Sequence, residues 1–199
     1  GLHRLWKSEV IKELRPDGEL SLLDVAGGTG DIANKFLNAG GGAATILDLN
    51  KEMLEAGKLK YPNSKAMWVH GNAEKLPFKA ETFDLYTISF GIRNVTNIDK
   101  ALEEAYRVLK PGGRFICLEF SNVSNDFIKK FYDFYSFKVI PFIGKKVAKS
   151  QDSYDYLVES IRKFPTAIKF KQMILDAGFA EVEYRKFSFG VVAMHIGYK

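Results

Sequence analysis

The sequence is poor in cysteine and has no long apolar run. Its single cysteine, Cys117, excludes an internal disulfide and is typical of a reducing compartment. No apolar stretch approaches the roughly 20 residues that a membrane-spanning helix needs, and no secretory signal pattern is visible. We therefore expect a folded domain that is neither disulfide-stabilised nor membrane-spanning. Because the chain opens abruptly at Gly1 inside a predicted helix, we also expect further residues upstream.

Histidine is scarce as well. His3, His70 and His195 fall in different predicted elements without metal-ligand spacing, so we predict no metal site. Lysine and arginine number 29 against 24 acidic residues, and the net charge of +5 favours anionic partners without naming them. With 199 residues, 46% of them hydrophobic, the chain is long enough to bury the core of one domain.

Strand-like and helix-like segments alternate along most of the chain. Short apolar or β-branched segments predict strands at 22–26, 44–48, 66–69, 83–90 and 114–120. Helical spacing of apolar residues predicts helices at 4–14, from 31 onward, at 51–60, 98–109 and 166–177. Thr96, with Asp99 three residues on, is expected to cap the helix at 98–109. Two further β-like runs, 180–187 and 191–198, are joined so closely that they must pair antiparallel.

This alternation predicts an α/β, Rossmann-like fold in a single domain, 1–199. We expect a seven-stranded, mostly parallel sheet with an antiparallel last strand and helices on both faces. Residues 121–163 interrupt the alternation and are predicted to be an insertion with a lid-like role.

A glycine-rich loop follows the strand predicted at 22–26. Gly27, Gly28 and Gly30 end this strand, and a helical pattern begins at Asp31. Glycines let a ligand lie directly on the main chain, and the following helix directs its unpaired amide groups toward that ligand. Strand, glycine turn and helix together open a nucleotide-binding α/β unit.

Charge favours one class of ligand at this loop over another. The spacing from Gly28 to Ala33, with Asp48 twenty residues after Gly28, also fits a dinucleotide, which keeps an NAD-dependent oxidoreductase as the rival. However, Asp24 and Asp31 flank the loop, and residues 16–34 contain no lysine or arginine. Two carboxylates disfavour a pyrophosphate and suit a ligand with an ammonium group. For Asp31, a helix-capping role is an equal alternative.

These residues favour S-adenosyl-L-methionine, which carries an ammonium, a carboxylate and a sulfonium. Asp48, at the end of the second strand, can accept hydrogen bonds from both ribose hydroxyls of this ligand. Asn72 can bind the adenine edge beside the main chain of Ala73.

Several stretches of the sequence carry a family resemblance. They are HRLWK (3–7), LLDVAGGTGDIA (22–33), DLNKEML (48–54), GNAEKLPF (71–78), FDLYTISFGIRNV (83–95), YRVLKPGGRF (106–115), LEFS (118–121), DSYDYLVESIRKFP (152–165), DAGF (176–179) and GVVAMHIGYK (190–199). Together they resemble class I S-adenosylmethionine-dependent methyltransferases and, more narrowly, the ubiquinone/menaquinone biosynthesis C-methyltransferase family of the UbiE type. The glycine loop and LKPGG occur in many methyltransferases, whereas TISFGIRN and DSYDYLVESIR are far narrower.

The resemblance implies C-methylation of a polyprenyl benzoquinol, or of demethylmenaquinol, with S-adenosyl-L-methionine as donor. Its cofactor positions carry over to Thr29, Asp48, the pair Asn72 and Ala73, and Ser89; Asp24, Gly28 and Gly30 join them from the loop itself. Family members usually carry a segment ahead of HRLWK, and this sequence starts after it. The resemblance also implies a location at the bacterial inner membrane or at the matrix face of the mitochondrial one.

Methylation of a ring carbon needs an electron-rich acceptor. Loss of a phenolic proton pushes charge onto the ring, and the enzyme must then stabilise a phenolate or accept the proton. Arg93 follows the strand predicted at 83–90, at the sheet edge where ligands of such folds bind, and we expect it to stabilise that charge. A solvated arginine, or one that binds another anion, is the alternative. Asn94 is expected to orient a ring oxygen.

The insertion is rich in lysines and aromatic residues. Residues 127–149 hold six lysines, seven aromatics and one acid, a composition suited to an anionic membrane surface. The alternatives are a lid over the substrate or a contact in a homodimer or quinone-synthesis complex. No recognised RNA-binding motif supports a nucleic-acid partner. A non-catalytic cofactor-binding subunit of such a complex remains the alternative of a different class.

Overall fold

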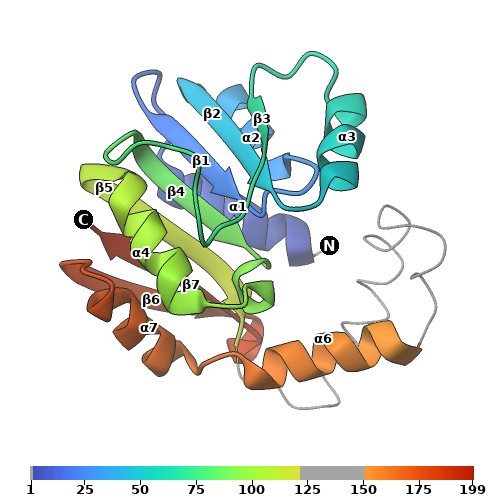
Figure 1. Ribbon diagram of the computed structural model, residues 1–199, viewed down its shortest axis with the longest axis vertical. Coiled ribbons are helices and arrows are strands. Elements are labelled where there is room, and N and C mark those ends of the chain that lie inside the picture. Colours follow the sequence, from blue (N-terminus) through green and yellow to red (C-terminus); the bar gives the residue numbers. More distant parts are fainter. Residues whose placement is uncertain (1, 122–150) are drawn as a thin grey trace.

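The computed structural model describes residues 2–121 and 151–199 (Figure 1). The elements are α1 (Leu2–Leu14), β1 (Ser21–Val25), α2 (Asp31–Asn38), β2 (Ala43–Asp48), α3 (Lys51–Lys60), β3 (Met67–His70), β4 (Phe83–Ser89), the 3₁₀ turn η1 (Ile92–Asn94), α4 (Ile98–Val108), β5 (Leu109–Phe120), α6 (Gln151–Lys163), α7 (Ala167–Asp176), β6 (Glu181–Phe187), the 3₁₀ turn η3 (Ser188–Gly190) and β7 (Val192–Tyr198). Most of the insertion predicted at 121–163, including the lysine-rich stretch 127–149, lies outside the described residues.

The strands form one sheet in the order β3-β2-β1-β4-β5-β7-β6. The first five strands in this order are parallel, and β7 runs antiparallel between β5 and β6. This confirms the predicted fold class, including its antiparallel last strand. The order of the strands reverses between β1 and β4, so the carboxyl ends of these two strands border the crevice where open α/β sheets bind ligands.

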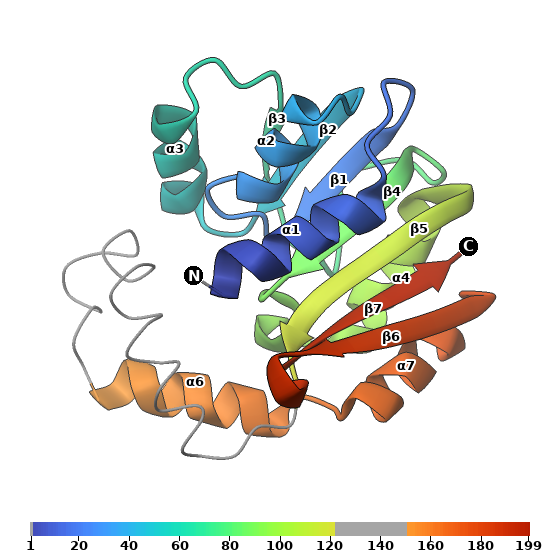
Figure 2. The same ribbon diagram turned by 180° about the vertical axis from the view of Figure 1, so that it is seen from behind.

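Helices cover both faces of the sheet. One face carries α1 and α2, and the other carries α4 and α7 (Figures 1 and 2). Successive side chains of β1 alternate between these layers, since Leu22 packs with Trp6 and Phe36 while Leu23 packs with Leu102 on the other side. None of the helices within the described ranges is long and apolar enough to cross a membrane.

One predicted helix start is wrong. Thr96 was expected to cap the helix after β4, but the capping residue is Asn97, whose side chain accepts from the backbone N–H of Lys100 at 3.0 Å. The backbone N–H of Thr96 instead donates to Glu74 Oε1 at 3.0 Å. The cause is a contact between segments far apart in the chain. The carboxylate of Glu74, in the loop after β3, accepts hydrogen bonds from the backbone N–H groups that precede this helix.

His195 has a structural role in β7. Its Nε2 lies 2.9 Å from the carbonyl oxygen of Ala167, and its ring stacks on Tyr184 and meets the edge of Phe170. Burial lowers the pKa of His195 to about 4, a shift that the hydrogen bond to Ala167 only partly opposes.

The pKa of His195 predicts an acid-sensitive contribution to stability. Because the unfolded imidazole binds a proton near pH 6.5, the contribution is present above that pH and is lost as the pH falls toward 4. The loss is expected to be about 3 kcal/mol. The measurement is urea unfolding of wild type and His195→Phe between pH 4 and 8. As the pH falls, only the wild type should lose this contribution to the free energy of unfolding. Parallel pH profiles of the two proteins would contradict the prediction.

Candidate active site

A loop that connects β1 to α2 lies at the carboxyl edge of the sheet. In this glycine loop (residues 26–30), Ala26, Gly28 and Gly30 have φ angles of 50°, 57° and 77°, the left-handed region that favours glycine. The backbone N–H of Gly28 donates to Oδ2 of Asp48 at 2.8 Å, and the other carboxylate oxygen accepts from Asn50 N at 2.8 Å. Asp48 therefore fastens the glycine loop to the end of β2.

Asp24 lies beneath the glycine loop. Its side chain is 1% exposed, and Oδ1 accepts from the Thr87 hydroxyl at 2.8 Å. Within the described part of the chain, Oδ2 has no hydrogen-bond partner. Burial raises the pKa of Asp24 to about 7, although the bond from Thr87 and the charge of Lys7 oppose the shift. Asp24 therefore holds a proton much more readily than an ordinary aspartate.

Asp31 contradicts the charge argument made from the sequence. Its carboxylate lies 3.0 Å from Lys7 Nζ and 2.5 Å from Lys60 Nζ, and it accepts from the hydroxyl of Tyr61 at 2.9 Å. Burial alone would raise the pKa of Asp31, but the two lysines outweigh it and hold the pKa well below its usual range. The helix cap is Gly30, without a side-chain bond. The lysines come from α1 and α3, outside the residues 16–34 considered above.

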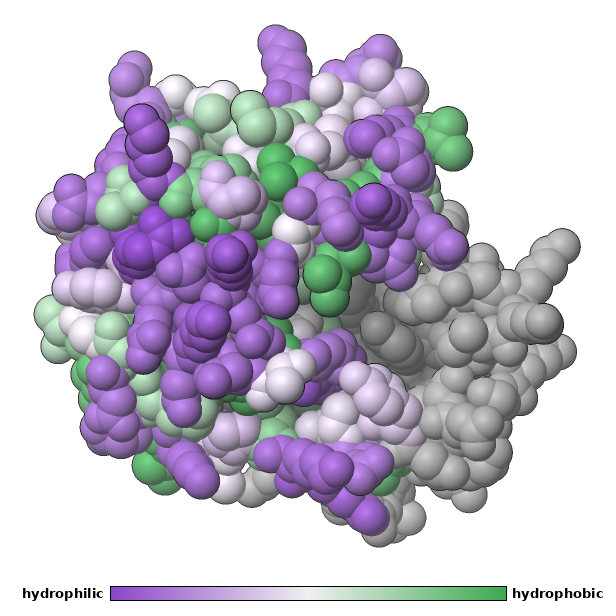
Figure 3. Space-filling model, in the orientation of Figure 1, coloured by the Kyte–Doolittle hydropathy of each residue, from purple (hydrophilic) through white to green (hydrophobic). Residues whose placement is uncertain are grey.

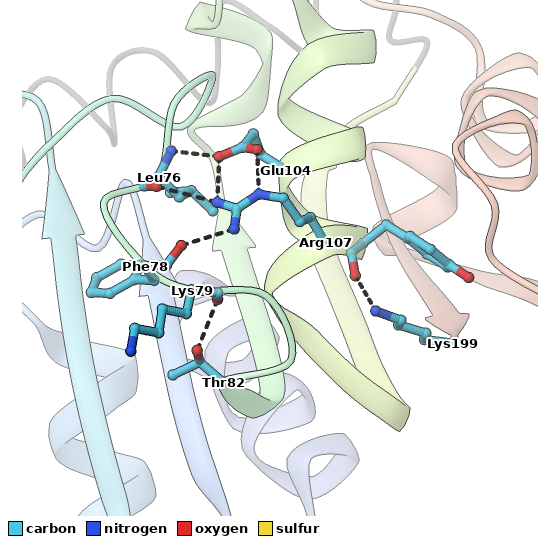
Figure 4. Close-up of polar contacts among 8 residues, drawn as sticks. Leu76, Phe78, Lys79, Thr82, Glu104, Arg107 and Lys199 are labelled. Atoms are coloured by element: carbon cyan, nitrogen blue, oxygen red, sulfur yellow. Dashed lines mark hydrogen bonds and ion pairs between the residues drawn. The ribbon is translucent and has the colours of Figure 1, made fainter.

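The loop after β3 is held against α4 by a charged clamp (Figure 4). Arg107 donates from Nε to Glu104 Oε1 at 2.6 Å and from Nη1 to the carbonyl oxygen of Phe78 at 2.8 Å. It also donates to the carbonyl oxygen of Leu76 at 3.2 Å, and the backbone N–H of Leu76 donates to Glu104 at 2.7 Å. The Glu104–Arg107 clamp therefore fixes the backbone that follows Asn72.

Asn72 and Ala73 begin this clamped loop. Asn72 is exposed, and its side-chain oxygen accepts from the backbone N–H of Glu74 at 2.9 Å. This bond turns the side-chain oxygen back onto its own loop. Ala73 is 8% exposed and packs into the core below.

A second loop, the acceptor loop (residues 89–94), follows β4. Arg93 is tied to Glu119 at the end of β5: its Nη1 lies 2.8 Å from Oε1 of Glu119 and also donates to the carbonyl oxygen of Phe90 at 2.7 Å. The side chains of Arg93 and Glu119 are 4% and 1% exposed. The guanidinium also lies 5.2 Å from the ring centroid of Phe120. Arg93 is therefore a buried, charge-paired arginine and not a solvated one.

The two ends of the acceptor loop carry polar groups. At its start, the buried hydroxyl oxygen of Ser89 has no hydrogen-bond partner among the residues that the structure describes. At its end, Oδ1 of Asn94 accepts from the hydroxyl of Tyr156, which comes from α6, at 3.2 Å. The middle of the loop touches the glycine loop, because Gly91 packs against Ala26.

The predicted site residues thus gather at one edge of the sheet. Asp48 and Ser89 end β2 and β4, and Thr29, Asn72 and Arg93 follow β1, β3 and β4, so five residues far apart in sequence share this edge. A surface hollow beside them is lined by Asp48, Leu49, Asn50, Lys51 and Glu52. No cluster of three potential metal ligands occurs in the described residues.

Comparison with known proteins identifies the family of this arrangement. The profile of the ubiE/COQ5 methyltransferase family matches residues 1–199. The chain belongs to this family. Among curated relatives, it is 50% identical to "2-methoxy-6-polyprenyl-1,4-benzoquinol methylase, mitochondrial" from Dictyostelium discoideum, over all of this chain and 74% of that protein. The Homo sapiens protein of the same name is 48% identical, over all of this chain and 73% of that one.

Solved structures of low sequence identity share the fold of this ubiE/COQ5 family member. A methyltransferase complex with a Trm112 activator from Haloferax volcanii contains a chain with a TM-score of 0.74 at 16% identity, covering 98% of this chain and 90% of that one. A SAM-dependent methyltransferase from Aquifex aeolicus gives 0.70 at 17% identity, covering 96% and 88%.

Sequence reasoning missed several residues of this methyltransferase site. Arg107 falls in YRVLKPGGRF (106–115), which served only as part of the resemblance, and its partner Glu104 lies one helical turn earlier. Glu119 was noticed only as part of LEFS. A buried carboxylate at the end of an apolar strand is the signal that identifies Glu119, since such a charge requires a partner.

Proposed function

We propose that this chain transfers the methyl group of S-adenosyl-L-methionine to a ring carbon of a polyprenyl benzoquinol. The observation that carries the proposal is the 50% identity, across the whole chain, to a protein named for this activity. The distribution of polar groups at the carboxyl edge supports it, because one set surrounds the glycine loop and another follows β4.

The residues at the glycine loop fit S-adenosyl-L-methionine. Asp48 keeps lone pairs for the ribose hydroxyls besides those that bind the loop, and the pair Asn72 and Ala73 would hold the adenine. The buried Ser89 hydroxyl, at the end of β4, has no hydrogen-bond partner in 2–121 or 151–199 and could bond to the cofactor. Gly28, Thr29 and Gly30 present main chain to the ligand, and buried Asp24 supports them from below. When bound, this cofactor supplies an electrophilic methyl group.

Arg93 and Asn94 would act on the acceptor. A ring carbon would receive the methyl group of the cofactor, and the quinol would release one proton to solvent as that carbon gains its new bond. Arg93 places positive charge at this edge to stabilise the phenolate, while its ion pair with Glu119 keeps the guanidinium in one orientation. Asn94, which Tyr156 holds from α6, would orient a ring oxygen.

The site is further proposed to work at a membrane surface. A polyprenyl quinol partitions into the bilayer, and the lysines and aromatic residues of 127–149 suit contact with anionic lipid.

The test is incubation of the protein with isotopically labelled S-adenosyl-L-methionine and reduced quinols, followed by mass spectrometry. Demethylated benzoquinol and demethylmenaquinol are offered separately under reducing conditions. Label on a ring carbon of the benzoquinol is expected. Label on the menaquinol alone would show that demethylmenaquinol, and not the benzoquinol, is the methyl acceptor. Donor binding without label in either quinol would favour a non-catalytic subunit. Thermal stabilisation by NADH, but not by S-adenosylhomocysteine, would overturn the donor assignment.

The Glu104–Arg107 clamp predicts a variant with weakened donor binding. Arg107→Ala releases the carbonyl oxygens of Leu76 and Phe78, so the loop that begins at Asn72 loses its fixed position. The dissociation constant of S-adenosylhomocysteine is expected to rise about five- to tenfold. Isothermal titration calorimetry measures it.

The matched control for this variant is Lys12→Ala. It breaks another ion pair between residues three apart in a helix, Lys12 with Glu9, which holds no loop. Equal dissociation constants for wild type and Arg107→Ala would contradict a role of the clamp in donor binding.

A further inference from the structure

The turn between β6 and β7 exposes an aromatic residue at an energetic cost. Phe189 is fully exposed, at 105% of its reference area, and its backbone is left-handed, with φ 58° and ψ 30°. This conformation is strained for a residue other than glycine. An aromatic ring in water contributes nothing to the core that would offset this cost. Both features are therefore unfavourable in the isolated fold. Burial of the Phe189 ring against a binding partner would offset their free-energy cost.

This turn, the Phe189 turn (residues 187–190), lies at the same edge as the site. Val192 pairs with Phe120 at the carboxyl end of β5, and the backbone N–H of Ser121 donates to the carbonyl oxygen of Val191 at 2.9 Å. Because β5 is parallel to β4, the Phe189 turn and the acceptor loop lie at the same end of the sheet.

Packing holds the turn in a fixed position relative to the acceptor loop. Trp6 Nε1 donates to Oγ of Ser188 at 3.0 Å, and the Trp6 ring centroid lies 6.0 Å from that of Phe90. The Phe90 ring in turn lies 4.9 Å from Phe120, over which Arg93 sits. A row of aromatic side chains thus joins the turn to the acceptor loop, so the exposed ring of Phe189 projects from a rigid base.

A basic residue lies beside the turn. Lys186 is exposed, and its Cδ lies 3.8 Å from the Cβ position of Gly190. Arg162 and Lys163, in the last turn of α6, are exposed as well. Lys163 pairs with Glu159 on the solvent side of this helix. On the face seen in Figure 3, by contrast, the described residues are mostly hydrophilic and the apolar ones are scattered.

We propose that the Phe189 turn inserts into the surface of an anionic bilayer, with Lys186 beside it contacting lipid headgroups. The ring of Phe189 would leave water for the acyl boundary, and the acceptor loop would then face the membrane. This inference rests on the proposed function, since the polyprenyl tail of that acceptor is confined to the bilayer. The proposal assigns the membrane contact to Phe189 and Lys186, independently of the stretch 127–149.

The experiment measures binding of the full chain to vesicles with and without anionic lipid by sedimentation. Phe189→Gly is expected to weaken partitioning about tenfold, which matches the lost burial of one aromatic side chain. Because glycine adopts a φ of 58° without strain, this variant should unfold at the same temperature as the wild type or at a higher one. Lys186→Gln is expected to weaken binding about fivefold on anionic vesicles only.

Met67→Ser is the matched control. Met67 is an exposed apolar residue, 61% accessible, at the start of β3 and hence at the opposite edge of the sheet, and its loss should leave binding unchanged. Equal binding of wild type and Phe189→Gly would overturn the proposal, and so would a change confined to the oligomeric state in sedimentation velocity. Methylation of a short-chain, water-soluble quinol should be unaffected in Phe189→Gly. Absence of that activity in the wild type would count against the proposed function and not against vesicle binding.

Discussion

Glu119→Ala is expected to lower the free energy of unfolding by about 3–5 kcal/mol and to abolish methyl transfer. The variant leaves the guanidinium of Arg93, 4% exposed, without the carboxylate that lies 2.8 Å away. A buried charge that has lost its partner carries the full cost of desolvation, so the acceptor loop must move to hydrate it. Urea unfolding measures the stability, and labelled methyl transfer measures the activity.

A double replacement separates the structural role of this pair from its chemical role. Arg93→Met combined with Glu119→Leu removes both charges and keeps apolar volume, and this often restores the stability that a single replacement loses. The double variant should therefore unfold much like wild type and still fail to methylate, while S-adenosylhomocysteine binding persists. Near-normal turnover of the double variant would show that Arg93 contributes no charge to the reaction.

Gly91→Ala is expected to destabilise the protein by about 1–3 kcal/mol and to weaken donor binding. A Cβ at Gly91 would lie 2.4 Å from the Cβ of Ala26, well inside contact distance. The acceptor loop and the glycine loop meet at this point, so relief of the overlap must displace one of them. Thermal unfolding and titration with S-adenosylhomocysteine measure the two effects.

Exchanging the two residues tests the geometry directly. In Ala26→Gly with Gly91→Ala, the methyl group moves from one loop to the other and the overlap disappears. Glycine also suits position 26, where φ is 50°. This double variant is expected to recover most of the stability and donor affinity. If it is as impaired as Gly91→Ala alone, the contact between the loops is not the cause.

The sheet was predictable because its signals are local. Apolar runs at 22–26 and 114–120 identify buried strands, and the helices between them leave a parallel arrangement as the only compact one. The brief connection before Val191 imposes the antiparallel pair. Asp48 and Asn72 were placed correctly at strand ends for the same reason, since the carboxyl ends of parallel strands share one edge.

The charges of the site were not predictable in this way. Residues 16–34, around Asp31, contain no basic residue, so the sequence predicts an unpaired acid. In the structure, Lys7 and Lys60 approach Asp31 from two other helices. From its own segment Arg93 is expected to be an unpaired cation, yet Glu119 pairs with it from β5, 26 residues away in sequence. Asp24 reads as an ordinary carboxylate, whereas burial under the glycine loop raises its pKa to about 7.

By itself the sequence determined the α/β fold, the strand ends that carry the site and the resemblance to a methyltransferase family. These depend on periodicity and on residues close together in the chain. Only the tertiary structure decided which charges are paired, which loops touch and that exposed Phe189 lies at the same end of the sheet as the acceptor loop. Ion pairing and pKa depend on distances of a few ångströms between segments far apart in the chain, and on the water that packing removes.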